Sequence, residues 1–349
     1  MNWAERGGKM ANQSLATKYR PTDFSSLTEQ SAIKDILENQ IKTKTFQHGY
    51  LFTGPAGTGK TTSARIFASM INDGKGNPIE VDAASNSGVD NIRQIIEDAK
   101  RKPLDAEYKI FIVDECHSLS SESWQALLKT LEEPPKFTIF IFCTTNPEKI
   151  PPTILSRVQR YNFQKISNEG IVERLGYIIA QEIVHNEDII YTEDAVDYIA
   201  KGSTGGMRDA ITLLDKCLSL SRTLNLDNVL KTIGGEDYNT FITFLSALEE
   251  KEKEISIKVV EDVYNAGKDV KQFMKDFAKF ILEVEKYTIY GNFDYVNLPN
   301  TLESHLEQLN SVDLFNVMGF VVSLNSQIKW ENDAKTLIEL SILIYCGKE

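Results

Sequence analysis

The sequence predicts an α/β domain with a parallel β-sheet, followed by helical domains. Short apolar runs alternate with amphipathic stretches from Gly49 to Phe163, and this alternation is typical of βαβ units in which helices cover a parallel sheet. After Phe163 strand signals largely vanish while helical periodicity continues. Because 349 residues exceed what one hydrophobic core usually holds, we expect separate domains at 1–165, 166–235 and 236–349.

The expected strands are short and apolar. Two of them are nearly continuous runs of Ile, Phe and Val, as expected for strands that are buried on both faces. The strands are predicted at Tyr50–Thr53, Ile79–Val81, Lys109–Val113, Thr138–Cys143 and Arg160–Phe163. Helical patterns lie between them at about 60–71, 89–101 and 121–132. Pro134 and Pro135 close the last of these, because proline cannot continue a helix.

The second half of the chain has helical patterns throughout. Residues 167–232 predict four short helices, with breaks near Asn186, Gly202 and Leu224. Beyond Gly235 a longer helical region carries an apolar stripe with spacings of three and four residues. The stripe comprises Val270, Phe273, Met274, Phe277, Phe280, Ile281 and Val284. Core packing is the first interpretation of this stripe, and an oligomer interface is the alternative.

Composition favours a cytoplasmic protein without a membrane partner. The chain is 42% hydrophobic and 25% charged, and it contains no apolar run long enough to cross a bilayer. The segment Met1 to Met10 lacks the apolar core of a secretory signal, and Met10 is an alternative start. The four cysteines lie far apart, without the paired spacing of a zinc site or a disulfide framework. We expect all four to be buried thiols.

Charge is divided unevenly along the chain. Residues 1–165 hold 21 Lys and Arg against 19 Asp and Glu, whereas residues 166–349 hold 17 against 31. The net charge is therefore +2 in the first half and −14 in the second, which sum to the −12 of the whole chain. Contacts with phosphate backbones are expected in the first half, and contacts with protein in the second. Two solvated surfaces of different sign explain the same pattern equally well.

A glycine-rich loop predicts a nucleotide site. It lies between a predicted strand and a predicted helix, which is the context that a phosphate-binding loop requires. Its glycines let backbone N–H groups turn toward phosphate oxygens at the helix N-terminus, where Lys60 would reach the β and γ phosphates and Thr61 would ligate Mg²⁺. The nucleotide-binding residues are Gly54, Pro55, Ala56, Gly57, Thr58, Gly59, Lys60, Thr61 and Thr62. These residues predict an ATP-binding, ATP-hydrolysing protein.

Two carboxylates follow the third predicted strand. Asp114 would lie in the second coordination shell of the bound Mg²⁺ or contact a bound water, and Glu115 would orient and polarise the attacking water. Either residue alone could be a structural cap, but the pair together with the loop favours catalysis. The tetrapeptide from Asp114 to His117 also resembles a box of superfamily 2 helicases. That class needs a second motor domain with its own sheet, which the helical second half does not predict.

Over residues 15–235 the motifs resemble the clamp-loader branch of the AAA+ ATPases, and in particular the gamma/tau subunits of bacterial DNA polymerase III. Besides the loop and the two carboxylates, the segments Lys18–Pro21, Val81–Ser85 and Ala126–Pro135 carry the resemblance. It implies an AAA+ P-loop NTPase fold for residues 1–165, a small helical lid for 166–235 and an all-α, collar-like oligomerisation domain for 236–349.

The resemblance also implies roles for further residues. Tyr19, Arg20 and Pro21 match the segment that packs on the nucleotide base. Thr145 matches sensor 1, near the γ-phosphate, and Arg157 matches an arginine finger that reaches into the neighbouring subunit's site. Such a finger contributes about 10³ to 10⁵ in rate. Arg208, in the segment Gly205–Ala210, matches sensor 2 and would contact the phosphates from the lid.

The sequence departs from the family pattern in three places. Residues 71–78 contain no cysteine where relatives carry a four-cysteine zinc module, so no zinc is predicted. Val158 replaces the cysteine that follows the finger. The chain stops soon after the collar-like region, without the extension that binds polymerase and helicase. These departures fit a divergent bacterium or a bacteriophage.

The implied function is ATP-dependent clamp loading. The chain would join other subunits in a ring, which we expect to be a pentamer, that opens a sliding clamp and places it on primer-template DNA without sequence preference. Candidate DNA contacts are Arg93, Lys100, Arg101 and Lys149. Two alternatives stay open. One is a catalytically silent, stator-like subunit, and the other is a branch-migration or helicase-loading motor.

Overall fold

The computed structural model describes residues 13–185, 188–233, 238–293, 295–299, 302–309 and 314–347. The chain divides into two compact units, Met1–Asn186 with Ser203–Asp215 and Glu187–Gly202 with Lys216–Glu349. The boundaries expected at residues 165 and 235 stay predictions, and residue 235 lies outside the described residues. The alternative start between Met1 and Met10 also lies outside them.

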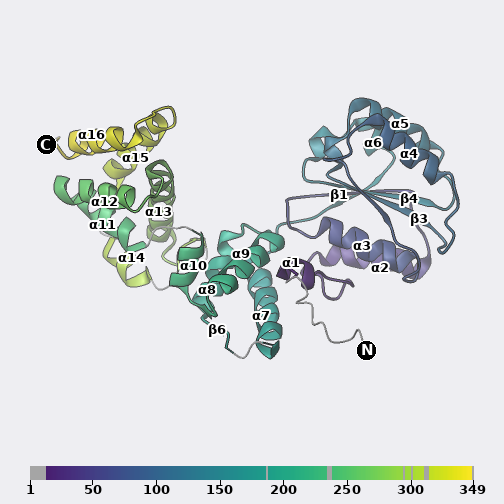
Figure 1. Cartoon of the computed structure of the whole chain (residues 1–349), viewed down its shortest axis with the longest axis horizontal. Helices are drawn as coiled ribbons and strands as arrows, with labels where there is room; N and C mark the ends of the chain where they lie inside the picture. Colours follow the sequence, from purple (N-terminus) through teal and green to yellow (C-terminus); the bar gives the residue numbers. More distant parts are fainter. Residues whose placement is uncertain are drawn as a thin grey trace, which may run out of the picture. The chain divides into compact units, whose positions relative to one another are not determined.

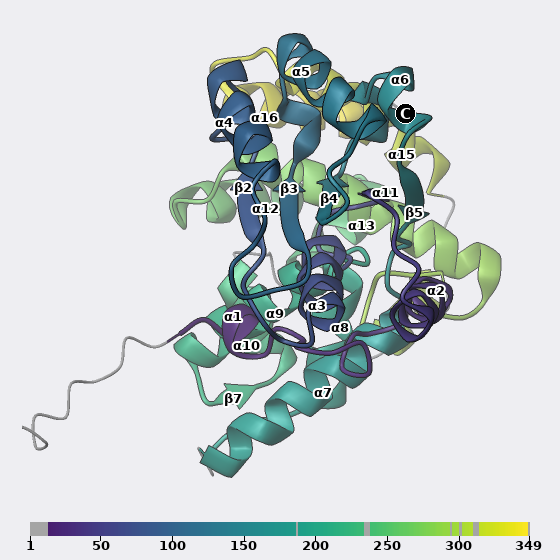
Figure 2. The same cartoon turned by 90° about the vertical axis from the view of Figure 1, so that its right-hand side faces the viewer.

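A five-stranded parallel sheet forms the centre of the first unit. Its strands follow the spatial order β2-β3-β4-β1-β5, and every neighbouring pair is parallel. Figure 2 shows β2, β3, β4 and β5 succeeding one another across the sheet. The strands are β1 (Gly49–Thr53), β2 (Ile79–Asp82), β3 (Lys109–Asp114), β4 (Thr138–Thr144) and β5 (Gln159–Asn162). All five predicted strands are confirmed to within one residue at each end.

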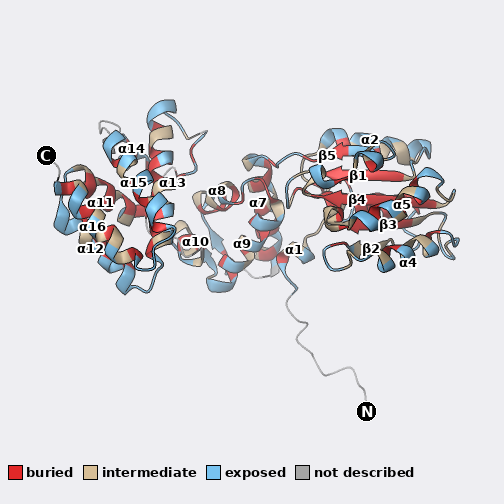
Figure 3. Ribbon diagram, turned by 90° about the horizontal axis from the view of Figure 1, so that it is seen from above, coloured by how far each residue is buried: buried red, intermediate tan, exposed pale blue. Residues whose placement is uncertain are grey.

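Helices cover both faces of this sheet (Figure 1). Successive side chains of a strand point to opposite faces. Tyr50 and Phe52 accordingly join the apolar cluster beneath α2 (Ser31–Thr43) and α3 (Lys60–Ile71). Leu51 joins the cluster on the other face, with α4 (Val89–Ala99) and α5 (Ser121–Glu132). Strands β1 and β4 are buried along their whole lengths, as Figure 3 shows. This burial explains their nearly continuous apolar sequences.

The helices of the first unit largely follow the predicted pattern. The bounds of α3 and α5 are those expected, whereas α4 ends at Ala99 rather than at 101. The Ser120 hydroxyl accepts from the Ser123 N–H and caps the start of α5. The remaining elements are α1 (Leu15–Lys18), the 3-10 turns η2 (Cys116–Ser118) and η3 (Pro147–Lys149), α6 (Pro152–Leu155), α7 (Asn168–His185) and the first part of α9 (Met207–Leu220).

The second unit is mainly helical. Besides the rest of α9, it contains the helices α8 (Glu193–Gly202), α10 (Leu226–Ile233), α11 (Tyr238–Glu249), α12 (Lys253–Asn265), α13 (Val270–Tyr290), α14 (Glu303–Leu309), α15 (Phe315–Ile328) and α16 (Ala334–Gly347). With α7 in the first unit, the four helices expected in 167–232 are confirmed. A parallel pair of two-residue strands, β6 (Ile190–Tyr191) and β7 (Thr223–Leu224), was not predicted.

The apolar stripe of α13 forms core. All seven of its residues are buried against α11, α12 and α15 in one cluster, so the first interpretation of the stripe is confirmed. The four cysteines are buried free thiols, as expected. Among the described residues, no helix combines the length and apolar character that crossing a membrane requires.

Candidate nucleotide site

The glycine-rich loop joins the end of β1 to the start of α3. Gly57 has a φ of 72°, a conformation that side chains rarely adopt. A Cβ added there would lie 3.0 Å from the Cα of Gly206. The backbone of the loop therefore passes directly against the turn that precedes α9, and the Met207 N–H donates to the Gly57 carbonyl at 3.0 Å. Conformation and close packing both require glycine at position 57.

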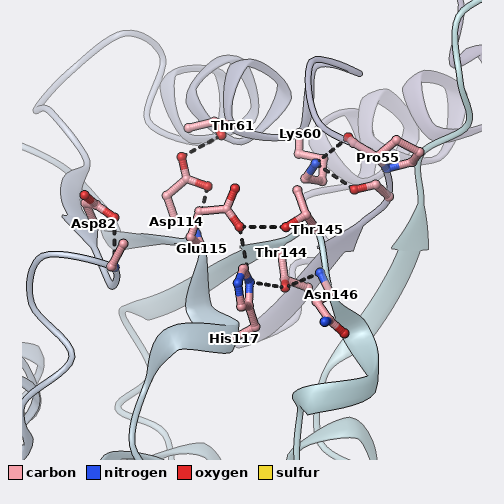
Figure 4. Close-up of polar contacts among 12 residues, drawn as sticks. Pro55, Lys60, Thr61, Asp82, Asp114, Glu115, His117, Thr144, Thr145 and Asn146 are labelled. Atoms are coloured by element: carbon pink, nitrogen blue, oxygen red, sulfur yellow. Dashed lines mark hydrogen bonds and ion pairs between the residues drawn. The ribbon is translucent and has the colours of Figure 1, made fainter. Parts of the chain in front are cut away.

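Lys60 is folded into the loop that precedes it. Its Nζ donates to the carbonyl oxygens of Gly54 at 2.8 Å and Pro55 at 2.7 Å (Figure 4). The residue is 6% exposed, and this burial lowers the pKa of Lys60 from its ordinary value. Among the described residues, the hydrogen-bond partners of this cation are two carbonyl dipoles, and an anion would be a stronger partner.

Two oxygen-bearing side chains meet beside the lysine. The Thr61 hydroxyl, in the first turn of α3, donates to the Asp114 carboxylate at the end of β3, with 2.9 Å between the oxygens. The other Asp114 oxygen accepts from the Glu115 N–H at 3.0 Å. Hydroxyl and carboxylate oxygens are ligands that Mg²⁺ accepts, usually together with phosphate oxygens and water. The residues present therefore fit a magnesium ion that arrives with a nucleotide.

Glu115 turns toward the end of β4. Its backbone is left-handed, with a φ of 45°. The Oε2 atom of its carboxylate accepts from the Thr145 hydroxyl at 3.1 Å and lies 3.2 Å from Nδ1 of His117. The same Nδ1 lies 3.0 Å from the Thr144 hydroxyl. Thr145, which the resemblance places near the phosphates, thus contacts the carboxylate expected to orient water.

These groups border a cavity of about 370 Å³. The structure brings to its wall most of the residues expected to bind nucleotide: Tyr19, Arg20, Pro21, Ala56, Gly57, Thr58, Gly59, Lys60, Thr61, Thr62 and Arg208. Asp114 and Glu115 also line it. Gly54, Pro55, Thr145 and Arg157 do not. The carbonyl oxygens of Gly54 and Pro55 accept hydrogen bonds from Lys60, and the Thr145 hydroxyl donates to Glu115.

Positively charged side chains line the cavity. Burial lowers the pKa of Arg20, and the neighbouring guanidinium groups of Arg65 and Arg208 lower it further. Arg20, Lys60, Arg174 and Arg208 all line the cavity, together with the carboxylates of Asp114, Glu115 and Asp209, and Arg20 lies near Arg208. A polyanion would relieve their mutual repulsion, so this electrostatic arrangement favours a ligand with several negative charges.

The segment that carries Tyr19 is fastened to α7. The Tyr19 hydroxyl and the Lys18 ammonium both donate to Oε1 of Glu182, at 2.7 and 2.6 Å. Arg174 donates to the Tyr19 carbonyl at 2.8 Å and stacks over the Tyr177 ring. Sequence reasoning missed Glu182 and Arg174, because both belong to a helix with an ordinary amphipathic pattern. These contacts hold one wall of the cavity in place.

Arg157 lies away from the cavity wall. It follows α6, and its guanidinium donates to the Glu132 carboxylate at 2.7 Å, the Thr153 carbonyl at 2.6 Å and the Ser156 hydroxyl at 2.9 Å. About a third of its side chain is exposed. In the described part of the chain, no three or more His, Cys, Asp or Glu side chains gather in a way that could hold a metal ion.

The fold and the arrangement of the site are those of the AAA+ class of P-loop proteins. A parallel sheet carries the glycine loop after β1 and the Asp-Glu pair at the end of β3, and a helical region follows. A solved structure of the RuvB Holliday junction branch migration motor of Thermotoga maritima is similar. It is 22% identical, with a TM-score of 0.50 over 66% of this chain and 80% of that chain. This likeness concerns the fold alone.

Comparison with protein families narrows the class. Residues 79–167 match the family described as DNA polymerase III, delta subunit, and residues 171–223 match the clamp loader subunit, ATPase lid domain. DNA polymerase III subunit tau of Bacillus subtilis (strain 168) is 33% identical over 97% of this chain and 64% of its own length. Subunit gamma/tau of Mycoplasma genitalium is 35% identical over 86% of this chain and 53% of its own length.

The chain therefore has the AAA+ fold and resembles, over most of its length, the gamma/tau subunits of DNA polymerase III. It spans between about half and two thirds of the length of these relatives. A plant protein, STICHEL of Arabidopsis thaliana, is also similar, at 29% identity over 95% of this chain and 29% of its own length.

Proposed function

We propose that this chain binds ATP with Mg²⁺ in the cavity between the glycine loop and Arg208, and hydrolyses it. The observation that carries the proposal is the convergence on one cavity of the Lys60 ammonium, the Thr61–Asp114 pair and the Glu115 carboxylate. Two of these residues begin α3 and two lie at or directly after the end of β3, and together they supply a phosphate-binding cation, two magnesium ligands and a base. The crowding of Arg20 and Arg208 supports the same polyanionic ligand.

Each residue has a definite task in this proposal. Lys60 exchanges its carbonyl partners for phosphate oxygens, and the N–H groups of the loop donate to the phosphates at the start of α3. Thr61 and Asp114 hold Mg²⁺, which when bound neutralises charge on the phosphates. Glu115 accepts a hydrogen bond from the attacking water and orients it. Arg208 donates to the phosphates from the start of α9, and the segment Tyr19–Pro21 packs on the base.

We propose further that hydrolysis serves clamp loading. The family matches and the gamma/tau relatives support a subunit of a ring, which we expect to be pentameric, that opens a sliding clamp and places it on primer-template DNA in the bacterial cytoplasm. Arg157 would complete the site of the neighbouring subunit. Its position outside the cavity of its own chain is compatible with that role.

The first test is a binding and hydrolysis measurement on the full chain. Wild type should bind a fluorescent ATP analogue only weakly without Mg²⁺ and tightly with it, and Lys60→Ala should lose both binding and hydrolysis. Lys275→Ala, which removes an exposed lysine from α13, should leave both unchanged. Full hydrolysis by Lys60→Ala would overturn the nucleotide assignment.

The second test separates clamp loading from its alternatives. Hydrolysis by the chain with its copurifying subunits should rise when both a sliding clamp and primed DNA are added. With a silent, stator-like subunit, the hydrolysis rate of the complex would be the same whether or not Lys60 is intact. A branch-migration or helicase-loading motor would respond to DNA but ignore the clamp.

A further inference from the structure

His117 occupies a position that the proposed mechanism leaves unused. It lies in η2, directly after the Asp-Glu pair, and only about a fifth of its side chain is exposed. Its Nδ1 lies 3.2 Å from Oε2 of Glu115 and 3.0 Å from Oγ1 of Thr144. Figure 4 shows the imidazole beneath the carboxylate, between the ends of β3 and β4.

The surroundings of this imidazole favour a proton on Nδ1. An ionised carboxylate only accepts hydrogen bonds, so Oε2 of Glu115, 3.2 Å away, favours the tautomer in which Nδ1 is a donor. The Thr144 oxygen accepts from the Asn146 N–H at 3.0 Å, and its hydroxyl hydrogen-bonds to the Cys116 thiol. That oxygen is thereby free to accept from Nδ1 as well. In that tautomer the Nδ1–H group faces both oxygens, and it places the imidazole between Glu115 and the backbone that follows β4.

The two contacts on Glu115 fall on the same oxygen. Oε2 accepts from Thr145 and lies 3.2 Å from Nδ1 of His117, whereas Oε1 has no hydrogen-bond partner in the described part of the chain. Figure 4 shows Oε1 pointing away from both donors, toward the side where Thr61 and Lys60 lie. Glu115 is partly exposed and could otherwise adopt several rotamers. Two donors on one oxygen hold the other oxygen toward the cavity.

We propose that His117 is a positioning residue for Glu115: its Nδ1–H anchors one carboxylate oxygen so that the other accepts a hydrogen bond from the attacking water. The inference rests on the proposed ATP hydrolysis. It assigns a task to the histidine that ends the helicase-like tetrapeptide. Thr145 and His117 then act together on the same carboxylate oxygen, Oε2.

Substitutions at position 117 test the anchor. Asn carries a donor at the δ position, where Nδ1 stands, whereas Gln moves its donor one bond further and Leu has none. His117→Leu and His117→Gln should lower kcat about 10-fold, which is less than the 10²- to 10⁴-fold typical of losing a general base. His117→Asn should retain most of the rate. ATP affinity should be the same in all three variants, because none of them touches the phosphate loop.

A double substitution shows whether the effect passes through Glu115. In a Glu115→Gln background, His117→Leu should cause no further loss, because the group it positions is gone. Equal losses in His117→Asn and His117→Leu, or a full additional loss in the Glu115→Gln background, would overturn the inference. A wild-type chain that hydrolyses no ATP with its partner subunits would overturn the proposed function instead.

A second readout does not depend on hydrolysis. Nitrogen-15 spectra of the four histidine side chains at pH 8, assigned by comparison with His117→Asn, should show a proton on Nδ1 of His117. That signal should change in Glu115→Ala. A proton on Nε2 alone would contradict the proposed contact, whatever the rate of hydrolysis.

Discussion

Arg157 is held by its own chain in this structure. Its guanidinium is shared among a carboxylate, a carbonyl and a hydroxyl. An arginine that acts on a neighbouring subunit must give up at least the Glu132 carboxylate. Because that ion pair is partly exposed, it contributes only about 0 to 1 kcal/mol, and the exchange is energetically accessible.

Arg157→Ala should therefore slow hydrolysis in the assembled ring by about 10³-fold or more while ATP binding stays unchanged. Glu132→Gln removes the competing carboxylate but keeps the arginine, so its rate should equal or exceed that of wild type. Arg222→Ala, at an exposed arginine of the second unit, serves as the matched control. Steady-state hydrolysis and an ATP titration on the same preparations measure both quantities. A normal rate for Arg157→Ala would remove the finger assignment.

The sequence predicted some residues of the site but could not predict others. Lys60, Thr61, Asp114 and Glu115 lie in short motifs, so spacing alone indicated that they belong together. Glu182 was out of reach, because it meets Lys18 across 164 positions of the chain and no local pattern marks such a pair. The folding of Lys60 onto its own loop, and the contact between His117 and Glu115, likewise depend on three-dimensional packing.

At the scale of elements, the loop before α3 and the turn before α9 pack closely against each other, with Gly57 facing Gly206. Gly57→Ala introduces both a strained φ and a Cβ 3.0 Å from Gly206, so the turn must move away. We expect weaker ATP binding, because Arg208 is carried by that turn, and a stability loss of about 1 to 3 kcal/mol.

Gly176→Ala is the matched control for this prediction. Gly176 lies within α7, and a Cβ there would meet nothing within 4 Å. This change should raise stability slightly, by about 0.5 to 1 kcal/mol, and leave nucleotide affinity alone. Thermal unfolding and the ATP titration measure both effects. Equal behaviour of the two alanine variants would show that the close approach at Gly57 has no influence on the site.

The existence of the main elements was predictable, but their arrangement was not. Strands such as β3 and β4 are continuous apolar runs with polar residues at their ends, so their limits were found to within one residue. The order β2-β3-β4-β1-β5 places neighbours from distant parts of the chain side by side, and local periodicity carries no information on pairing. Strands β6 and β7 contain two residues each, too few to show an alternation.

At the scale of the whole molecule, the charge division bears on DNA binding. Of the four candidate contacts, Arg93 pairs with Asp90 and Lys100 pairs with Glu97. Arg101 and Lys149 are exposed, and their side chains have no hydrogen-bond or ion-pair partner among the described residues. Unpaired cations gain more from binding a phosphate than paired ones. We therefore expect Arg101 and Lys149 to contribute more to DNA affinity than Arg93 and Lys100.

Replacing Arg101 and Lys149 together by alanine should weaken binding of primer-template DNA equally for all sequences. It should also reduce the slope of log affinity against log salt by about 1 for each phosphate that the protein no longer neutralises. Lys275→Ala is the control, and fluorescence anisotropy at several salt concentrations is the measurement. An unchanged slope would exclude both residues from the DNA interface.

Because Lys60 hydrogen-bonds to the carbonyl groups of its own loop, we expect the base and the phosphates of a nucleotide to bind in different ways. In the proposed complex the base packs beside Tyr19, whereas the phosphates replace the carbonyl oxygens of Gly54 and Pro55 as hydrogen-bond partners of Lys60. We therefore expect this exchange of partners inside the loop to set how strongly ATP is preferred over adenosine.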